Sequence, residues 1–168
     1  MVQTAIRRAI SGGPPALRVF VVALAVQGFH MLEHVIQLVQ LYVLDLPEGH
    51  GLAGAAVDQE WVHFAYNSAL FATLLGVIVL AGPAQRKRWI VERRVGWALL
   101  VAVAVAQGYH FVEHSARFYQ YVVQGVAAPA GLIGQAFDVI VFHAVLNGVV
   151  YSLMIAAFAA LVIRRRPA

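Results

Sequence analysis

Four long apolar stretches divide the chain, and residues that end helices separate them. They cover residues 16–44, 58–81, 95–124 and 134–163. Each is longer than the roughly 20 apolar residues that a helix needs to cross a bilayer. Gly12-Gly13-Pro14-Pro15 precedes the first stretch and Gly82-Pro83 follows the second, and such pairs stop a helix. The pattern predicts four transmembrane helices, joined by outer loops 45–57 and 125–133 and by a linker over 82–94.

The first and third predicted helices each carry one polar stripe. Its members are Gln27, His30, Glu33, His34, Gln37 and Gln40 in the first helix, and Gln107, His110, Glu113, His114, Arg117 and Gln120 in the third. Steps of three and four residues place side chains on one face of a helix. Polar groups without partners cost several kcal/mol in lipid. Both stripes are therefore predicted to face the inside of the bundle.

The polar residues recur at a constant offset of 80 positions. Gln27, Gly28, His30, Glu33 and His34 return as Gln107, Gly108, His110, Glu113 and His114, and Asp58, His63 and Asn67 return as Asp138, His143 and Asn147. The outer loops share a similar pattern, with Gly51, Leu52 and Gly54 matching Gly131, Leu132 and Gly134. The sequence thus predicts two tandem two-helix repeats, residues 16–81 and 95–163. A pseudo-two-fold axis along the membrane normal would relate them within an antiparallel four-helix bundle.

Composition and charge agree with a membrane protein. Of the 168 residues, 61% are hydrophobic and 12% are charged, whereas a soluble domain has about 25% charged residues. Eleven of the 12 Lys and Arg residues lie in or near the basic lead 1–15, the linker 82–94 and the tail 164–168. Cytoplasmic segments carry such an excess. We therefore expect an integral protein of a bacterial plasma membrane, with both termini cytoplasmic, its first span retained and no nucleic-acid partner.

Depth along the helices brings the ionisable side chains together. At 1.5 Å per residue, Glu33 and His34 lie roughly 15 Å below the outer end of the first helix, and His63 lies at a similar level in the second. Six histidines and two glutamates can therefore converge in one layer. The chain has no cysteine, which excludes thiolate sites. Imidazole and carboxylate groups suit iron, copper or zinc.

The favoured hypothesis is a dinuclear metal site in the outer half of the bundle. The predicted ligands are His30, Glu33, His34 and His63 for one ion, and His110, Glu113, His114 and His143 for the other. Glu33 and Glu113 are also the candidate catalytic groups, and Gln27, Asn67, Gln107 and Asn147 would orient the rings. Iron is favoured as the metal, with copper or zinc as alternatives. The function would be that of a metal-dependent oxidoreductase or redox subunit, acting on a lipophilic substrate or within a larger membrane complex.

Three other interpretations remain open. A b-type haem could bind one histidine from each of two helices, with Gly28 and Gly108 providing room. The pattern His-x-x-Glu-His also occurs in zinc proteases, so an intramembrane hydrolase is an alternative, and a purely structural polar network is another. A channel is disfavoured because the stripe thins out toward the cytoplasmic half. The metal hypothesis predicts that Glu33→Gln or Glu113→Gln abolishes metal binding.

Two polar residues break the repeat. Arg117 stands where the first half has Gln37. It could hold an anionic group of a bound ligand, or pair with Asp138 or another acid, and we favour the salt bridge. His50 has Ala130 as its counterpart, and it is predicted to be a surface residue of the first outer loop.

Overall fold

The computed structural model describes residues 14–55, 59–80 and 94–162. Its elements are α2 (Pro15–Tyr42), α3 (Glu60–Leu80), α5 (Arg94–Val122), the short 3-10 helix η2 (Gly134–Ala136) and α6 (Val139–Val162). The four α-helices are each long and apolar enough to cross a membrane. The described part of the chain is thus all-helical, as predicted, and its four apolar helices fit an integral membrane protein.

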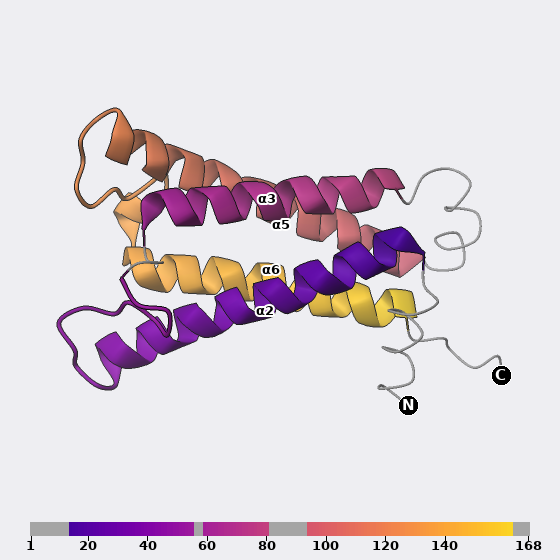
Figure 1. Ribbon diagram of the computed structural model, residues 1–168, viewed down its shortest axis with the longest axis horizontal. Coiled ribbons are helices and arrows are strands. Elements are labelled where there is room, and N and C mark those ends of the chain that lie inside the picture. The colour runs from indigo at the N-terminus through magenta and orange to yellow at the C-terminus, as the bar shows by residue number, and fades with distance from the viewer. Residues whose placement is uncertain (1–13, 56–58, 81–93, 163–168) are drawn as a thin grey trace.

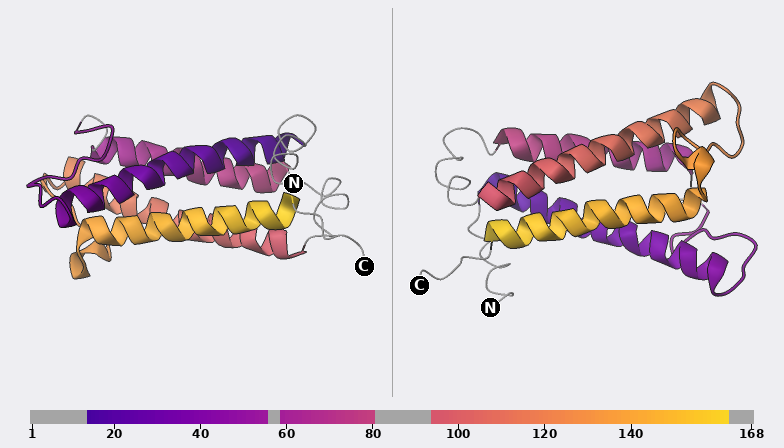
Figure 2. Two further views of the ribbon diagram at one scale, coloured as in Figure 1. Left: turned by 90° about the horizontal axis from the view of Figure 1, so that it is seen from below. Right: turned by 180° about the vertical axis from the view of Figure 1, so that it is seen from behind.

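The four α-helices form an antiparallel bundle in which sequence neighbours lie side by side (Figure 1). Helix α2 packs against α3 and α6, and α5 packs against the same two helices. The connections from α2 to α3 and from α5 to α6 lie at one end of the bundle, which we call the loop end (Figures 1 and 2). Helix α2 begins and α6 ends at the opposite end. The outer ends of the polar stripes on α2 and α5 therefore lie at the same end of the bundle.

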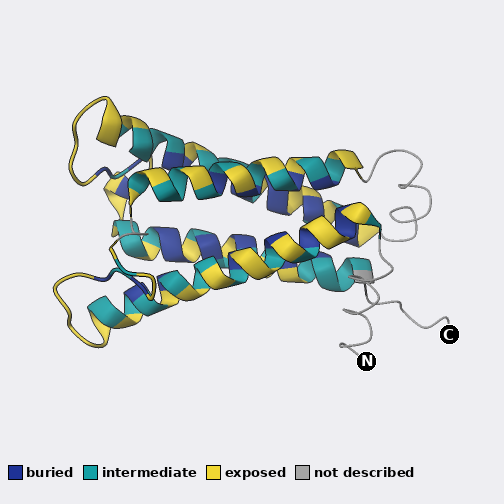
Figure 3. Cartoon of the chain, in the orientation of Figure 1, coloured by how far each residue is buried: buried dark blue, intermediate teal, exposed yellow. Residues whose placement is uncertain are grey.

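Away from the loop end, the interior is a hydrophobic core. It contains Ala16, Phe20, Ala23, Leu70, Leu74, Val77, Leu100, Val103, Ala104, Val150, Met154 and Ala157. Buried positions lie mainly on the inner sides of the helices and exposed positions on the outer sides (Figure 3), and many of the exposed residues are large and apolar. A lipid-facing surface of apolar side chains is what four membrane spans require. The core fills one half of the bundle. A polar site in the other half can therefore open only at the loop end or between two helices toward the lipid.

Helix α6 begins at Val139 rather than at Gly134, where the apolar stretch starts. Residues Gly134–Ala136 form η2 instead. The Asp138 carboxylate then accepts hydrogen bonds from the N–H groups of Ile140 and Val141, both at 3.0 Å, as an N-cap does. The Tyr42 hydroxyl donates to Asp138 at 2.6 Å. This bond, followed by those backbone donors, lowers the pKa of Asp138. Asp58, the counterpart of Asp138 in the first half, lies outside the described residues.

Candidate metal centre

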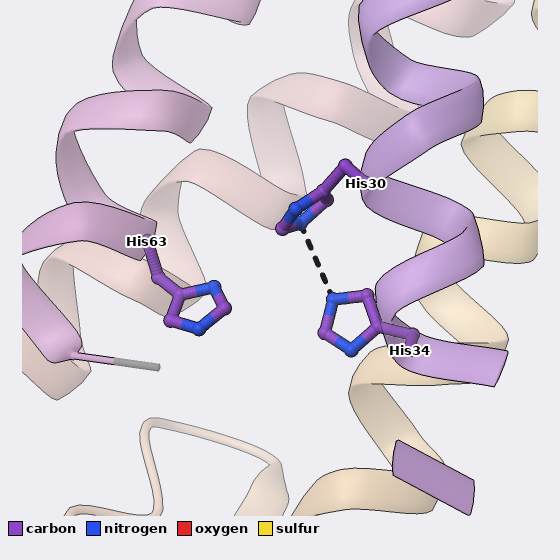
Figure 4. A group of neighbouring side chains, drawn as sticks. All are labelled: His30, His34 and His63. Carbon is purple, nitrogen blue, oxygen red and sulfur yellow. Dashed lines mark hydrogen bonds between the residues drawn. The ribbon is translucent and has the colours of Figure 1, made fainter. Parts of the chain in front are cut away.

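Two histidine triads occupy the loop half of the bundle. The first consists of His30 and His34 of α2 with His63 of α3, and the second of His110 and His114 of α5 with His143 of α6. Within each triad, one ring nitrogen from every histidine lies within 4.8 Å of the others. In the first triad the three rings converge on the space between α2 and α3 (Figure 4). All six histidines expected from the sequence are thus grouped as two sets of three.

The spacing within each helical pair matches that of two ligands on one ion. The Nε2 atoms of His30 and His34 are 3.2 Å apart, and those of His110 and His114 are 3.0 Å apart. Metal–imidazole bonds of about 2.0–2.1 Å place two ligands about 2.9–3.4 Å from each other in octahedral or tetrahedral geometry. The helix supplies this spacing because residues four apart share one face. A third imidazole from the neighbouring helix completes each set.

Hydrogen bonds fix the orientation of two of these rings. The Nδ1 of His34 lies 2.8 Å from the Gln37 amide oxygen, and the Nδ1 of His143 lies 2.8 Å from the backbone oxygen of Val139. Both oxygens are acceptors, so Nδ1 carries the proton and Nε2 presents a lone pair to the triad. Metal-binding histidines are held in this way. The buried Nε2 of His143 has no hydrogen-bond partner within the described part of the chain.

The two triads touch each other. The rings of His63 and His114 stack with centroids 5.6 Å apart and an interplanar angle of 6°. His114 and His143 follow at 4.7 Å within the second triad. The imidazole layer is therefore continuous across the interface of α3 and α5, so that groups bound at the two triads would be neighbours.

A layer of amides lies between the histidines and the hydrophobic core. Gln27 donates to the Asn147 side chain at 3.0 Å, and Gln107 donates to the Asn67 side chain at 2.9 Å. All four residues are fully buried. The asparagines in turn donate to the backbone oxygens of His63, at 2.9 Å, and His143, at 3.0 Å. The amides join α2 to α6 and α5 to α3, and they hold the backbone of the third histidine in each triad.

Both glutamates of the stripe point to the loops. The Glu33 carboxylate accepts hydrogen bonds from the N–H groups of Leu52, at 2.6 Å, and Ala53, at 3.2 Å. The Glu113 carboxylate is completely buried and accepts from the N–H groups of Leu132, Ile133 and Gly134 at 2.9–3.3 Å. Within the described residues, the groupings that could hold a metal ion contain histidines alone. The structure thus brings the histidines together and engages the expected carboxylate ligands elsewhere.

The glutamines at the outer end of each stripe complete this attachment. Gln40 donates to the backbone oxygen of Gly51 and accepts from its N–H, at 3.2 and 2.8 Å. Gln120 makes the same pair of bonds with Gly131, at 2.9 and 2.8 Å. Each loop is therefore fixed to the helix that carries two histidines of a triad.

Arg117 forms a salt bridge with Glu60. Its Nε donates to Glu60 at 3.0 Å, and its second terminal nitrogen makes a further bond to the same carboxylate. Both side chains are largely buried, with 15% and 16% of their surfaces exposed. The pair joins α5 to α3 at the loop end. The expected salt bridge exists, with Glu60 and not Asp138 as the partner. Sequence analysis missed Glu60 because its counterpart in the second half is Ile140.

Removing one partner of this ion pair is expected to destabilise the bundle. In Arg117→Met the Glu60 carboxylate keeps its charge in a poorly hydrated place. Breaking a fully buried pair costs about 3–5 kcal/mol, and partial exposure reduces this to about 1–3 kcal/mol. Unfolding in mixed micelles measures the loss. The double variant Arg117→Met, Glu60→Gln should recover part of the lost stability. If the single and the double variant lose equal stability, the ion pair is not buried as described.

Two cavities reach the triads. The larger, of about 310 Å³, is lined by His34, His63, His114, His143, Glu60 and Arg117 under the second loop, and we call it the polar cavity. The other, of about 220 Å³, is lined by Val26, Phe29, Val62, Tyr66, His30 and His63, among others, and we call it the apolar cavity. His34 and His63 line both. The first triad is thus reached from two directions.

The geometry describes two adjacent groups of three imidazoles, in which four of the six histidines are buried and two are half-buried. Imidazole donors bind zinc, copper, iron and nickel, and a set of three leaves a position open for another ligand. Comparison with known proteins adds no assignment, because no protein-family model, curated protein or solved structure matches this chain.

Proposed function

We propose that the protein is a membrane metalloprotein in which each histidine triad binds one transition-metal ion, and that the two ions carry out redox chemistry. The observation that carries the proposal is the convergence of three imidazoles in each half. The Nε2 atoms of the two histidines on one helix are spaced as ligands of one ion, and a ring nitrogen of the third lies within 4.8 Å of the others. The crossed pairs Gln27–Asn147 and Gln107–Asn67 further support two equivalent halves. We propose that these halves are tandem repeats related by a pseudo-two-fold axis along the membrane normal.

Copper or iron accounts best for a redox role. Each triad offers three nitrogens and no carboxylate, whereas di-iron bundles bind their metals mainly through glutamates. Nitrogen-only ligation therefore moves the preference toward copper, with iron as the second choice. The buried amide layer and the attached loops would hold the rings rigid while the ions change charge. Zinc would fill the same ligands without redox chemistry.

The haem alternative receives less support. Gly28 and Gly108 were expected to make room for the porphyrin, yet other side chains cover both. A Cβ on Gly28 would lie 2.9 Å from the Tyr151 hydroxyl, and one on Gly108 would lie 3.1 Å from the Phe71 ring. The glycines thus admit aromatic side chains of neighbouring helices. Hydrolysis is also less favoured, because both candidate general bases accept hydrogen bonds from loop backbone.

Metal analysis of the detergent-purified protein tests the proposal. We expect about two equivalents of copper or iron per chain and no Soret band. His50→Ala is the matched control, because His50 is the one histidine of the seven outside the triads, and it should retain both equivalents. A Soret band, or no bound metal after incubation of the apoprotein with copper and iron, would refute the proposal.

Gln37→Leu is expected to weaken metal binding at the first triad alone. It removes the acceptor that holds the Nδ1 proton of His34. Loss of such a group lowers metal affinity about 10–100-fold. The second half has Arg117 at this position, so its affinity should stay unchanged. Competition with a chelator, monitored by metal content, separates one weakened site from two. Equal weakening of both sites would contradict the independent orientation of the triads.

A further inference from the structure

The first triad is open toward the lipid, and the opening is apolar. Val26 and Phe29 of α2 line the apolar cavity, and 49% and 55% of their surfaces are exposed. Both lie in the middle of a membrane span, so their exposed surfaces meet hydrocarbon. Val62 and Tyr66 of α3 line it as well, and its polar lining consists of the three triad histidines with Glu33, Gln37 and His50. A molecule in the bilayer can thus reach the imidazoles between α2 and α3.

The corresponding place in the second half is filled. The counterpart of Val62 is Phe142, whose ring meets that of His143 edge to face at 5.3 Å and 87°. The histidines of the second triad are all buried, whereas His30 and His63 are only half-buried. A phenylalanine in place of a valine therefore distinguishes the two triads in their access from the lipid, although the polar cavity still reaches His114 and His143.

The size and lining of the apolar cavity limit what can enter. Its volume of about 220 Å³ is below the roughly 300–1,000 Å³ of sites that enclose a whole small molecule. An occupant would place one end in the cavity and leave the rest in the bilayer. The Tyr66 hydroxyl already donates to Gln27 at 2.6 Å, and the Glu33 carboxylate already accepts from the loop N–H groups. An incoming end would therefore meet the triad histidines, with Gln37 and His50 beside them.

We propose that the first triad is the substrate site, and that it takes a lipophilic molecule with a small polar end group, such as an alcohol or phenol, directly from the bilayer through the apolar cavity. The second triad lacks this opening to the lipid, and its ion would support the redox chemistry at the first triad through the stacked rings of His63 and His114. This inference rests on the proposed function, since the triads are taken to bind metal.

A membrane-soluble ligand tests this access. Cobalt(II)-loaded protein in lipid nanodiscs is titrated with 1-dodecylimidazole, which partitions into the bilayer, and separately with imidazole, which remains in water. Dodecylimidazole should change the visible cobalt spectrum of the native protein. Val62→Phe, which copies the second half, should weaken this response at least tenfold and leave the imidazole response unchanged. Val145→Phe adds the same bulk at a lipid-facing position of α6 that is 60% exposed, and it should behave as the native protein.

A second readout does not depend on metal. An alkyl diazirine dissolved in the bilayer should label the half-buried Tyr66 in the native apoprotein and fail to label it in Val62→Phe. Equal labelling in both proteins, or an unchanged dodecylimidazole response in Val62→Phe, would overturn lateral access. If cobalt does not bind at all, the proposed function fails, while the labelling of Tyr66 still decides whether lipophilic molecules enter.

Discussion

Replacing His143 by alanine is expected to leave one bound metal ion per chain instead of two. His143 is the only ligand that α6 contributes to the second triad, and its Nε2 faces the other rings because Nδ1 is held by Val139. Groups that merely orient a ligand change affinity about 10–100-fold, so loss of the ligand itself should exceed about 100-fold. Metal content after dialysis against a weak chelator measures the loss. His63→Ala should remove the other ion.

The contrast with Glu113→Gln decides which side chains are ligands. Glu113 directly precedes His114, yet its carboxylate accepts three loop N–H groups. Glu113→Gln should therefore keep both metal ions and lower only stability. The sequence alone predicted the opposite, because a carboxylate between two histidines resembles a ligand. If Glu113→Gln loses a metal as His143→Ala does, the carboxylate binds the ion and the loop contacts are secondary.

The sequence was sufficient for the bundle and for the convergence of the histidines, for two physical reasons. Lipid forces each span to be a helix, because its backbone must satisfy its own hydrogen bonds. Lipid also excludes polar side chains, so the stripes had to face one another. The buried Gln27, Asn67, Gln107 and Asn147 confirm this inward placement. Depth along each helix then followed from the rise per residue, which placed His34 and His63 in one layer.

The sequence was not sufficient for the partners of the glutamates, because these partners are backbone groups of loops. Helical periodicity says which face Glu33 and Glu113 occupy, but not how a loop returns to that face. A usable signal was present. Gly51 and Gly131 recur at the same offset as the two glutamates, and this repeated spacing between an acid and a glycine is what a close approach of backbone to carboxylate would produce. The salt bridge of Arg117 with Glu60 gave no such signal, because neither residue is repeated.

Gly131→Ala is expected to be among the most destabilising single-methyl changes in the protein. Gly131 has φ +79°, a conformation that costs about 1–2 kcal/mol for a residue with a Cβ. An added Cβ would also overlap the Glu113 carboxylate. Moving that carboxylate away leaves buried N–H groups without an acceptor, at about 1–3 kcal/mol each. The free energy of unfolding in mixed micelles, or the unfolding temperature, measures the effect.

Gly125→Ala is the control that separates the two causes. Gly125 also has positive φ, at +67°, but its Cβ would meet no atom within 4 Å. It therefore carries the backbone strain without the overlap, and Gly131→Ala should cost about 2–4 kcal/mol more, from the displaced Glu113 bonds. In the first loop, Gly51 corresponds to Gly131 and Gly54 serves as its control. The Glu33 bonds there are more exposed, so the difference in stability between the two alanine variants should be smaller. Equal losses in Gly131→Ala and Gly125→Ala would mean that the carboxylate does not hold the loop, and would return Glu113 to the metal site.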